Sequence, residues 1–252
     1  MSGWLQAAAW GGLAGSALLL GAAIGWWVPI GARAVAGVMA FGSGVLMAAL
    51  SFELMDEAHA LGGLLPTGLG FLAGAVAYTL ANAWLARRGA RHRKRSGLQL
   101  RDDAAGAGGG MAIAIGALLD GVPESMVIGL GLLPGGAVSA VMVAAIFLSN
   151  VPEGLSSAIG MKRAGRSAAY VFGIWAAIAL ASAVAAALGF VLFDAASPHA
   201  VALTMAFAAG AVLAMLVDTM IPEAYAEAHD AAGLITVAGF MVGFALSKGV
   251  GA

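Results

Sequence analysis

Two short motifs place a glutamate directly after a proline in the middle of an apolar stretch. Residues 120–125 read Asp-Gly-Val-Pro-Glu-Ser, and residues 149–154 read Ser-Asn-Val-Pro-Glu-Gly. Residues three or four apart share one face of a helix, so each motif presents its polar side chains together. The oxygen-bearing side chains of the two motifs form a candidate metal site: Asp120, Glu124, Ser149, Asn150 and Glu153.

Carboxyl groups in apolar surroundings need compensation. An ionised side chain at the centre of a membrane helix costs about 2.5–3.5 kcal/mol on insertion scales. Protonation removes the charge, and a cation bound by oxygens from two facing helices neutralises it. Because we expect the matched motifs at the same depth on adjacent helices, we favour a functional role over structural hydrogen bonding between helices.

The composition is that of a membrane protein. Of 252 residues, 62% are hydrophobic and only 10% are charged, whereas a soluble domain carries about 25% charged residues. The absence of cysteine excludes disulfides and thiolate metal sites. The net charge of −1 does not point to a nucleic-acid partner. No serine in the apolar stretches has a histidine nearby to activate it, so we do not expect an enzyme.

A helix needs about 20 mainly apolar residues to cross a membrane. Eight stretches meet this requirement: residues 7–29, 34–55, 64–86, 108–132, 136–160, 168–193, 200–221 and 232–250. The expected fold is therefore an all-α membrane protein with eight transmembrane helices, in one domain over residues 1–252. Residues 87–107 form its one long, basic loop.

The basic residues predict the orientation of these helices. Eleven of the twelve fall in the loops after the first, third and fifth spans: Arg33, Arg87, Arg88, Arg91, Arg93, Lys94, Arg95, Arg101, Lys162, Arg163 and Arg166. Because cytoplasmic loops carry an excess of lysine and arginine, both termini are expected outside. Only Lys248 falls on the outer side.

Two pairs of spans indicate an internal repeat. Residues 41–44 (Phe-Gly-Ser-Gly) align with 207–210 (Phe-Ala-Ala-Gly), and the same register aligns 55–58 with 221–224. On the predicted topology the second and seventh spans run in opposite directions, as do the fourth and fifth. Inverted repeats with interrupted helices are common in secondary transporters; chance similarity between apolar helices is the alternative.

Further acids lie near the ends of the second and seventh spans. Glu53 and Glu57 are near the outer end of the second, and Asp218 and Glu223 near the inner end of the seventh. Such acids attract cations to both mouths of a pathway, or they are simply solvated helix ends. Met47, in the second span, offers a thioether ligand or a packing side chain.

This pattern resembles the ZIP family of divalent-metal transporters, over nearly the whole chain. The resemblance rests on eight spans, both termini outside, a long cytoplasmic loop after the third span, and Pro-Glu motifs in the fourth and fifth. Residues 150–154 (Asn-Val-Pro-Glu-Gly) are closest to the family's fifth span, and residues 207–223 look like its seventh. The family implies a 3+2+3 inverted-repeat bundle with metal bound between spans four and five. It also implies elevator-like or rocking movement of the bundle that contains those spans.

The candidate site departs from the family pattern by lacking histidine. Asp120 stands where relatives have histidine, and Ser149 takes the place of histidine or glutamine, while Glu124 and Glu153 match the family's glutamates. Met47 lies near a family metal-facing position. Zinc sites usually include nitrogen or sulfur ligands, so oxygen donors favour manganese or iron(II). Zinc is the substrate that the resemblance implies.

The expected function is transport of a divalent metal ion into the cytoplasm across the inner (plasma) membrane, without an organic cofactor. Its partners are then the metal ion and the lipid bilayer. Gly70 and Gly74 in the third span serve either internal packing or a homodimer. Two alternatives stay open: a carrier of protons or organic solutes that uses the acids as proton relays, and a non-transporting ZIP-like metal sensor.

Overall fold

The computed structural model describes residues 2–87, 109–133 and 139–249; between 109 and 120 it describes only the backbone, except at Leu118. These residues form helices and no strand, which confirms the all-α class. The basic loop predicted at 87–107 lies outside the described residues, apart from Arg87. In chain order the helices are α1 (Gly3–Trp27), α2 (Ala32–Ala49), η1 (Leu50–Met55), α3 (Asp56–Gly62), α4 (Leu64–Leu85), α6 (Gly109–Leu130), α7 (Ala140–Arg163), α8 (Ala168–Phe193), α9 (Pro198–Met215), η3 (Leu216–Met220), α10 (Ile221–Ala228) and α11 (Ala231–Gly249).

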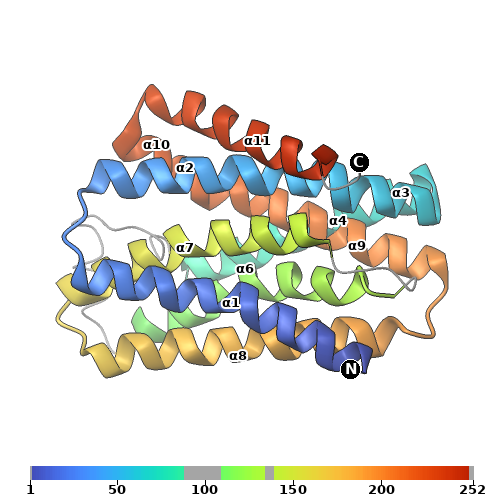
Figure 1. Ribbon diagram of the computed structural model, residues 1–252, viewed down its shortest axis with the longest axis horizontal. Coiled ribbons are helices and arrows are strands. Elements are labelled where there is room, and N and C mark those ends of the chain that lie inside the picture. Colours follow the sequence, from blue (N-terminus) through green and yellow to red (C-terminus); the bar gives the residue numbers. More distant parts are fainter. Residues whose placement is uncertain (1, 88–108, 134–138, 250–252) are drawn as a thin grey trace.

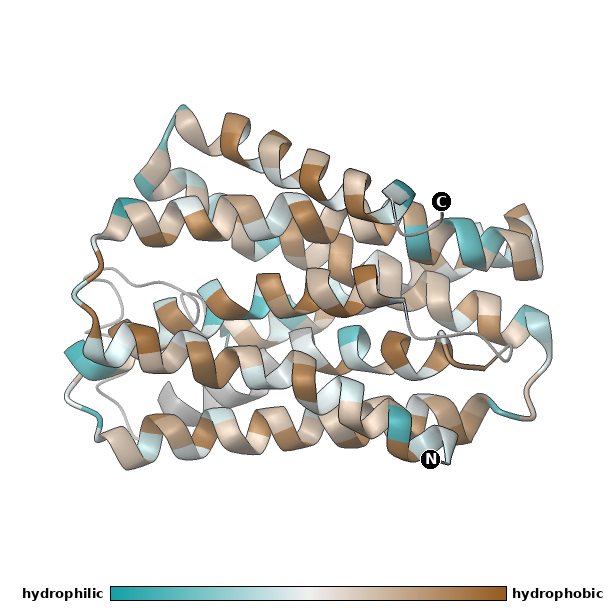
Figure 2. Ribbon diagram, viewed as in Figure 1, coloured by the Kyte–Doolittle hydropathy of each residue, from teal (hydrophilic) through white to brown (hydrophobic). Residues whose placement is uncertain are grey.

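The helices run along one long axis of the molecule (Figure 1). Seven of the described helical segments are long and apolar enough to cross a membrane: 3–27, 32–62, 64–85, 140–163, 168–193, 198–228 and 231–249. The eighth long helix, α6, carries the first Pro-Glu motif. Hydrophobic residues cover most of each helix, and hydrophilic residues gather towards the ends (Figure 2). The length and apolar composition of these helices are those of a multi-pass membrane protein.

Successive long helices alternate in direction, which sorts the connections to two ends of the bundle (Figure 1). One end, which we call the basic end, holds the α1–α2 and α7–α8 connections and the end of α4. Exposed Arg33, Arg87, Lys162 and Arg163 lie there. The other, called the terminal end, is where α1 begins and α11 ends. This distribution has the pattern that the predicted topology requires.

Two long helices have the same architecture. A shift of 166 residues, the difference between Phe207 and Phe41, superimposes the bounds of α2 on those of α9. It also places η1 over η3, α3 over α10, and the positive-φ residue Gly63 (φ 75°) over His229 (φ 47°). The two helices run in opposite directions, α2 towards the terminal end and α9 towards the basic end.

Each of these helices contains a π-helical segment, η1 or η3, and continues beyond it. A π segment inside an α-helix is rare and frequently marks a functional site. Hydroxyl groups bond the helix backbone beside both: Ser51 donates to the Met47 carbonyl at 2.8 Å, and Thr219 to the Met215 carbonyl at 2.7 Å. The chain thus forms continuous helices over Ala32–Gly62 and Pro198–Ala228.

Glycines divide the bundle into two closely packed halves. In the half formed by α1, α6, α7 and α8, called the α7 half, a Cβ on Gly154 would overlap the Leu18 carbonyl, and one on Gly129 would overlap that of Ala186. In the half formed by α2, α4, α9 and α11 with the segments that continue them, called the α2 half, Gly74 lies equally close to the Phe207 carbonyl. Gly70 and Gly74 therefore serve packing within the molecule.

Contact between the halves is made mainly by larger side chains. Gly42 of α2 faces α7, and an added Cβ there would lie 3.3 Å from main-chain atoms of Leu148 and Ser149, which is a tight contact but a less close one than those within the halves. Leu46 and Leu50 of the α2 half pack with Met142 and Ile146 of the α7 half in the main hydrophobic cluster. Side-chain contacts of this kind can rearrange more readily than backbones in direct contact.

Candidate functional site

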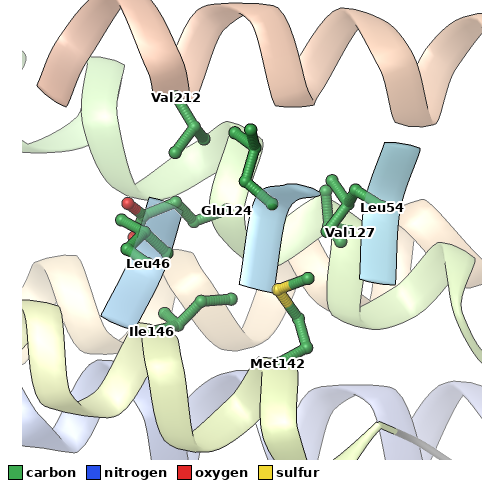
Figure 3. A pocket seen from close by; sticks show the side chains of 8 residues that line it. Leu46, Leu54, Glu124, Val127, Met142, Ile146 and Val212 are labelled. Carbon is green, nitrogen blue, oxygen red and sulfur yellow. The ribbon is translucent and has the colours of Figure 1, made fainter. Parts of the chain in front are cut away.

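Glu124 lies in an apolar cavity between the two halves. Its side chain is 4% exposed, and the cavity measures about 240 Å³, including space open to solvent. Figure 3 shows the Glu124 side chain directed towards Leu46 and Ile146. The other lining residues are all hydrophobic: Leu50, Leu54, Val127, Met142 and Val212. A carboxyl group among apolar side chains inside a membrane helix bundle is a functional candidate.

The second motif lies on α7 and is fully enclosed. Glu153 is 7% exposed and Asn150 5%. The Asn150 amide nitrogen donates to the Ala14 carbonyl of α1 at 3.1 Å, which orients its side-chain oxygen. Ser149 donates to the Ile146 carbonyl at 2.9 Å, so its oxygen lone pairs can still face a ligand. Both polar residues are thus held by main-chain carbonyls.

The two glutamates lie at different levels, contrary to the expectation of equal depth. Glu124 lies six residues before the end of α6, and Glu153 lies thirteen residues after the start of α7. At 1.5 Å per residue, Glu124 is about 9 Å along α6 from the last residue of that helix, and Glu153 is about 20 Å along α7 from its first residue. Both of these helix ends belong to the terminal end. In agreement, Glu124 shares its cavity with Met142 and Ile146, which precede Glu153 on α7. The sequence pattern predicted equal depth because it contains no information on how far one helix is displaced along the other.

A second cavity lies at the terminal end. It measures about 290 Å³, including space open to solvent, and Glu53, Glu57 and Ser139 line it. Glu53 accepts hydrogen bonds at both carboxylate oxygens, from Ser139 Oγ at 2.7 Å and from Ser247 Oγ at 2.6 Å. Three residues, Leu54, Val127 and Met142, line this cavity and the one around Glu124. The two cavities are therefore neighbours, with Glu53 lining one and Glu124 the other.

Towards the basic end from Glu153 lies a further buried carboxylate, Glu223 of α10. Glu223 is 9% exposed and accepts a hydrogen bond from Ser156 Oγ at 3.0 Å. Ser156 lies three residues after Glu153, on the same side of α7. Acidic side chains thus occur at successive levels: Glu53 and Glu57, then Glu124, then Glu153, then Glu223.

Three other predicted residues, Asp218, Met47 and Asp120, are not among these acids. Asp218 is exposed on η3, and Met47 is partly buried and packs against the main hydrophobic cluster, the packing role weighed for it. Asp120 belongs to α6, but its side chain lies outside the described part. The ligand roles of Asp120 and Met47 and the pathway role of Asp218 stay predictions.

Three serines join the acids although the sequence did not single them out. Ser139 is the N-cap of α7, where its Oγ also accepts from the Met142 amide at 3.1 Å, and Ser156 and Ser247 contact acids of distant segments. A serine before a helix is recognisable as a cap. Contacts between residues 67 to 194 positions apart leave no local signal.

The donor set for a metal ion consists mostly of oxygens. Within the residues that the structure describes, no three histidine, cysteine, aspartate or glutamate side chains gather closely enough to hold a metal ion. A cation at Glu153 would therefore need neutral oxygens, as Ser149 and Asn150 provide, or the Asp120 carboxylate. Comparisons of the chain with models of protein families and with curated proteins gave no match.

Proposed function

We propose that the protein transports divalent metal cations across the membrane, through a site between α6 and α7. The observation that carries the proposal is the line of acidic side chains that crosses the interface between the halves, with Glu124 and Glu153 buried at its centre. Ionised carboxyl groups at such depth are costly, and a succession of acids at different levels suits a cation that moves between sites.

The proposed architecture is a ZIP-like 3+2+3 bundle with both termini outside, in the inner (plasma) membrane. The matched bounds of α2–η1–α3 and α9–η3–α10, in helices of opposite direction, support an inverted repeat. Opposed repeats give transporters two equivalent ways to expose a central site. Uptake into the cytoplasm is the direction that the ZIP resemblance implies.

The proposed substrates follow from the donors. Carboxylate, amide and hydroxyl oxygens suit manganese and iron(II), and zinc is the ion that the ZIP resemblance implies. The proposed ligands lie at two levels, with Glu124 at one and Ser149, Asn150 and Glu153 at the other, and Asp120 is a further candidate ligand from α6.

Flux into liposomes tests the proposal. The purified protein is reconstituted, and uptake of manganese, iron(II), zinc and cadmium is followed with an enclosed indicator. Glu153→Gln and Asp120→Ala are expected to abolish uptake, and Asp56→Asn, which removes an exposed carboxylate of α3, is expected to preserve it. Proton flux without metal flux would instead favour the carrier that uses these acids as proton relays.

A further inference from the structure

Two hydrogen bonds join the halves of the molecule at well-separated levels. Ser139 and Ser156, both of the α7 half, donate to Glu53 and Glu223, both of the α2 half, at 2.7 and 3.0 Å. The serines are 17 residues apart along α7, which corresponds to about 25 Å. This separation covers most of the roughly 30 Å hydrocarbon core of a bilayer, with Glu124 and Glu153 between the two bonds.

The acids occupy related places in the two matched helices. The shift of 166 residues maps Glu57 onto Glu223, and Glu53 lies one turn before Glu57 within η1. Both bonds therefore connect α7 to the π segment of a matched helix or to the turn that follows it. A hydrogen bond from a serine of the α7 half to a glutamate of the α2 half is thus present on the terminal-end side and on the basic-end side of the candidate site.

The two bonds lie on opposite sides of that site. Ser139 and Glu53 both line the terminal-end cavity, which neighbours the Glu124 cavity. Ser156 and Glu223 are both buried, at 0% and 9% exposure, on the opposite side of Glu153. Separation of the halves at one end must break the bond at that end, while the bond at the other end can persist.

We propose that Ser139–Glu53 and Ser156–Glu223 are two latches with opposite effects, which set the end from which the candidate site is reached. The proposal rests on the proposed transport function for its purpose. In this structure both bonds are formed, and Glu124 and Glu153 are only 4% and 7% exposed. Loss of the first bond favours opening at the terminal end, and loss of the second favours opening at the basic end. Ser247 keeps Glu53 oriented within its own half.

The absence of cysteine from the chain allows a direct test. Two single-cysteine reporters are made, Ile146→Cys in the Glu124 cavity and Ile159→Cys on α7 beyond Ser156. Ile146 is 1% exposed and Ile159 8%. The rate of reaction with a hydrophilic maleimide is then measured in detergent without metal, so that the result does not depend on transport.

Opposite shifts are expected from the two latches. Ser139→Ala should accelerate labelling of the reporter at 146 about tenfold, since a hydrogen bond to a charged group biases an equilibrium by at least this factor, and should not accelerate labelling at 159. Ser156→Ala should accelerate labelling of the reporter at 159 by about the same factor and should not accelerate labelling at 146. Glu53→Ala should reproduce Ser139→Ala without altering the cap of α7, and Ser139→Thr should restore slow labelling. Ser51→Ala, which removes a hydroxyl bonded within its own helix, is the matched control.

Equal acceleration at both reporters would overturn the proposal, because it indicates general loosening. Unchanged labelling in both serine variants would overturn it as well. Opposite shifts together with absent metal flux would leave the latches established and the transport function refuted. Metal flux without the opposite shifts would support the transport function and refute the latches.

Discussion

At the scale of single residues, serine hydroxyls and a main-chain carbonyl orient several polar groups of the candidate pathway. Glu53 and Glu223 accept from serine hydroxyls, and Asn150 donates to a backbone carbonyl. A serine hydroxyl orients a carboxylate oxygen without itself carrying a charge. The sequence predicted which residues carry this chemistry. It could not predict their partners, because each partner lies on another helix.

Substitution of Asn150 tests this arrangement. Asn150→Ala removes the hydrogen bond to Ala14 and is expected to lower the free energy of unfolding by about 1 kcal/mol. Unfolding in detergent, followed by circular dichroism against denaturant, measures the change. Ser43→Ala removes a fully buried hydroxyl that bonds its own helix, and should change stability less. Equal stability of Asn150→Ala and the parent protein would contradict the role given to the amide.

At the scale of elements, the sequence predicted the helices better than their ends. The second span was expected at 34–55 but continues to Gly62, and the seventh was expected at 200–221 but continues to Ala228. Asp56, Glu57 and Glu223 made these continuations look like loops, because hydropathy measures transfer into lipid and not helix formation. The π segments were not predicted, since no residue type encodes the change in hydrogen bonding.

Close helix contacts at glycine carry a second prediction. Gly154→Ala would place a Cβ against the Leu18 carbonyl, so α1 and α7 must separate, at about 1–3 kcal/mol. A lower melting temperature in detergent is the expected result. Gly173→Ala on α8, where an added Cβ meets nothing within 4 Å, should leave the melting temperature unchanged or raise it. Similar melting temperatures for both variants would argue against the close packing of the α7 half.

At the scale of the whole molecule, the positions of the basic residues agree with the alternating directions of the helices. Because the helices alternate in direction, the start of α2, the end of α4 and the end of α7 come to one end of the bundle (Figure 1), and with them Arg33, Arg87 and Lys162. The positive-inside rule predicts that such a face is cytoplasmic. Burial of the acids between two halves could not be predicted from the sequence, because it depends on how the halves pack.

Sidedness gives a third prediction. Ala169→Cys at the basic end and Ala195→Cys at the terminal end are both at exposed positions, and the chain has no other cysteine. In intact cells, a membrane-impermeant maleimide is expected to label position 195 and to spare position 169 until the cells are permeabilised. The opposite pattern would reverse the orientation and, with it, the assignment of the outer mouth.

The central claim is that the buried acids of α6 and α7 bind a divalent cation. Titration of the purified protein with manganese(II), with free ion measured by electron paramagnetic resonance, tests this claim most directly. Binding by the parent protein and by Asp56→Asn, but at least tenfold weaker binding by Glu153→Gln, is the predicted result. Equal binding by all three proteins, or no binding by the parent protein of manganese or of competing zinc, would contradict it.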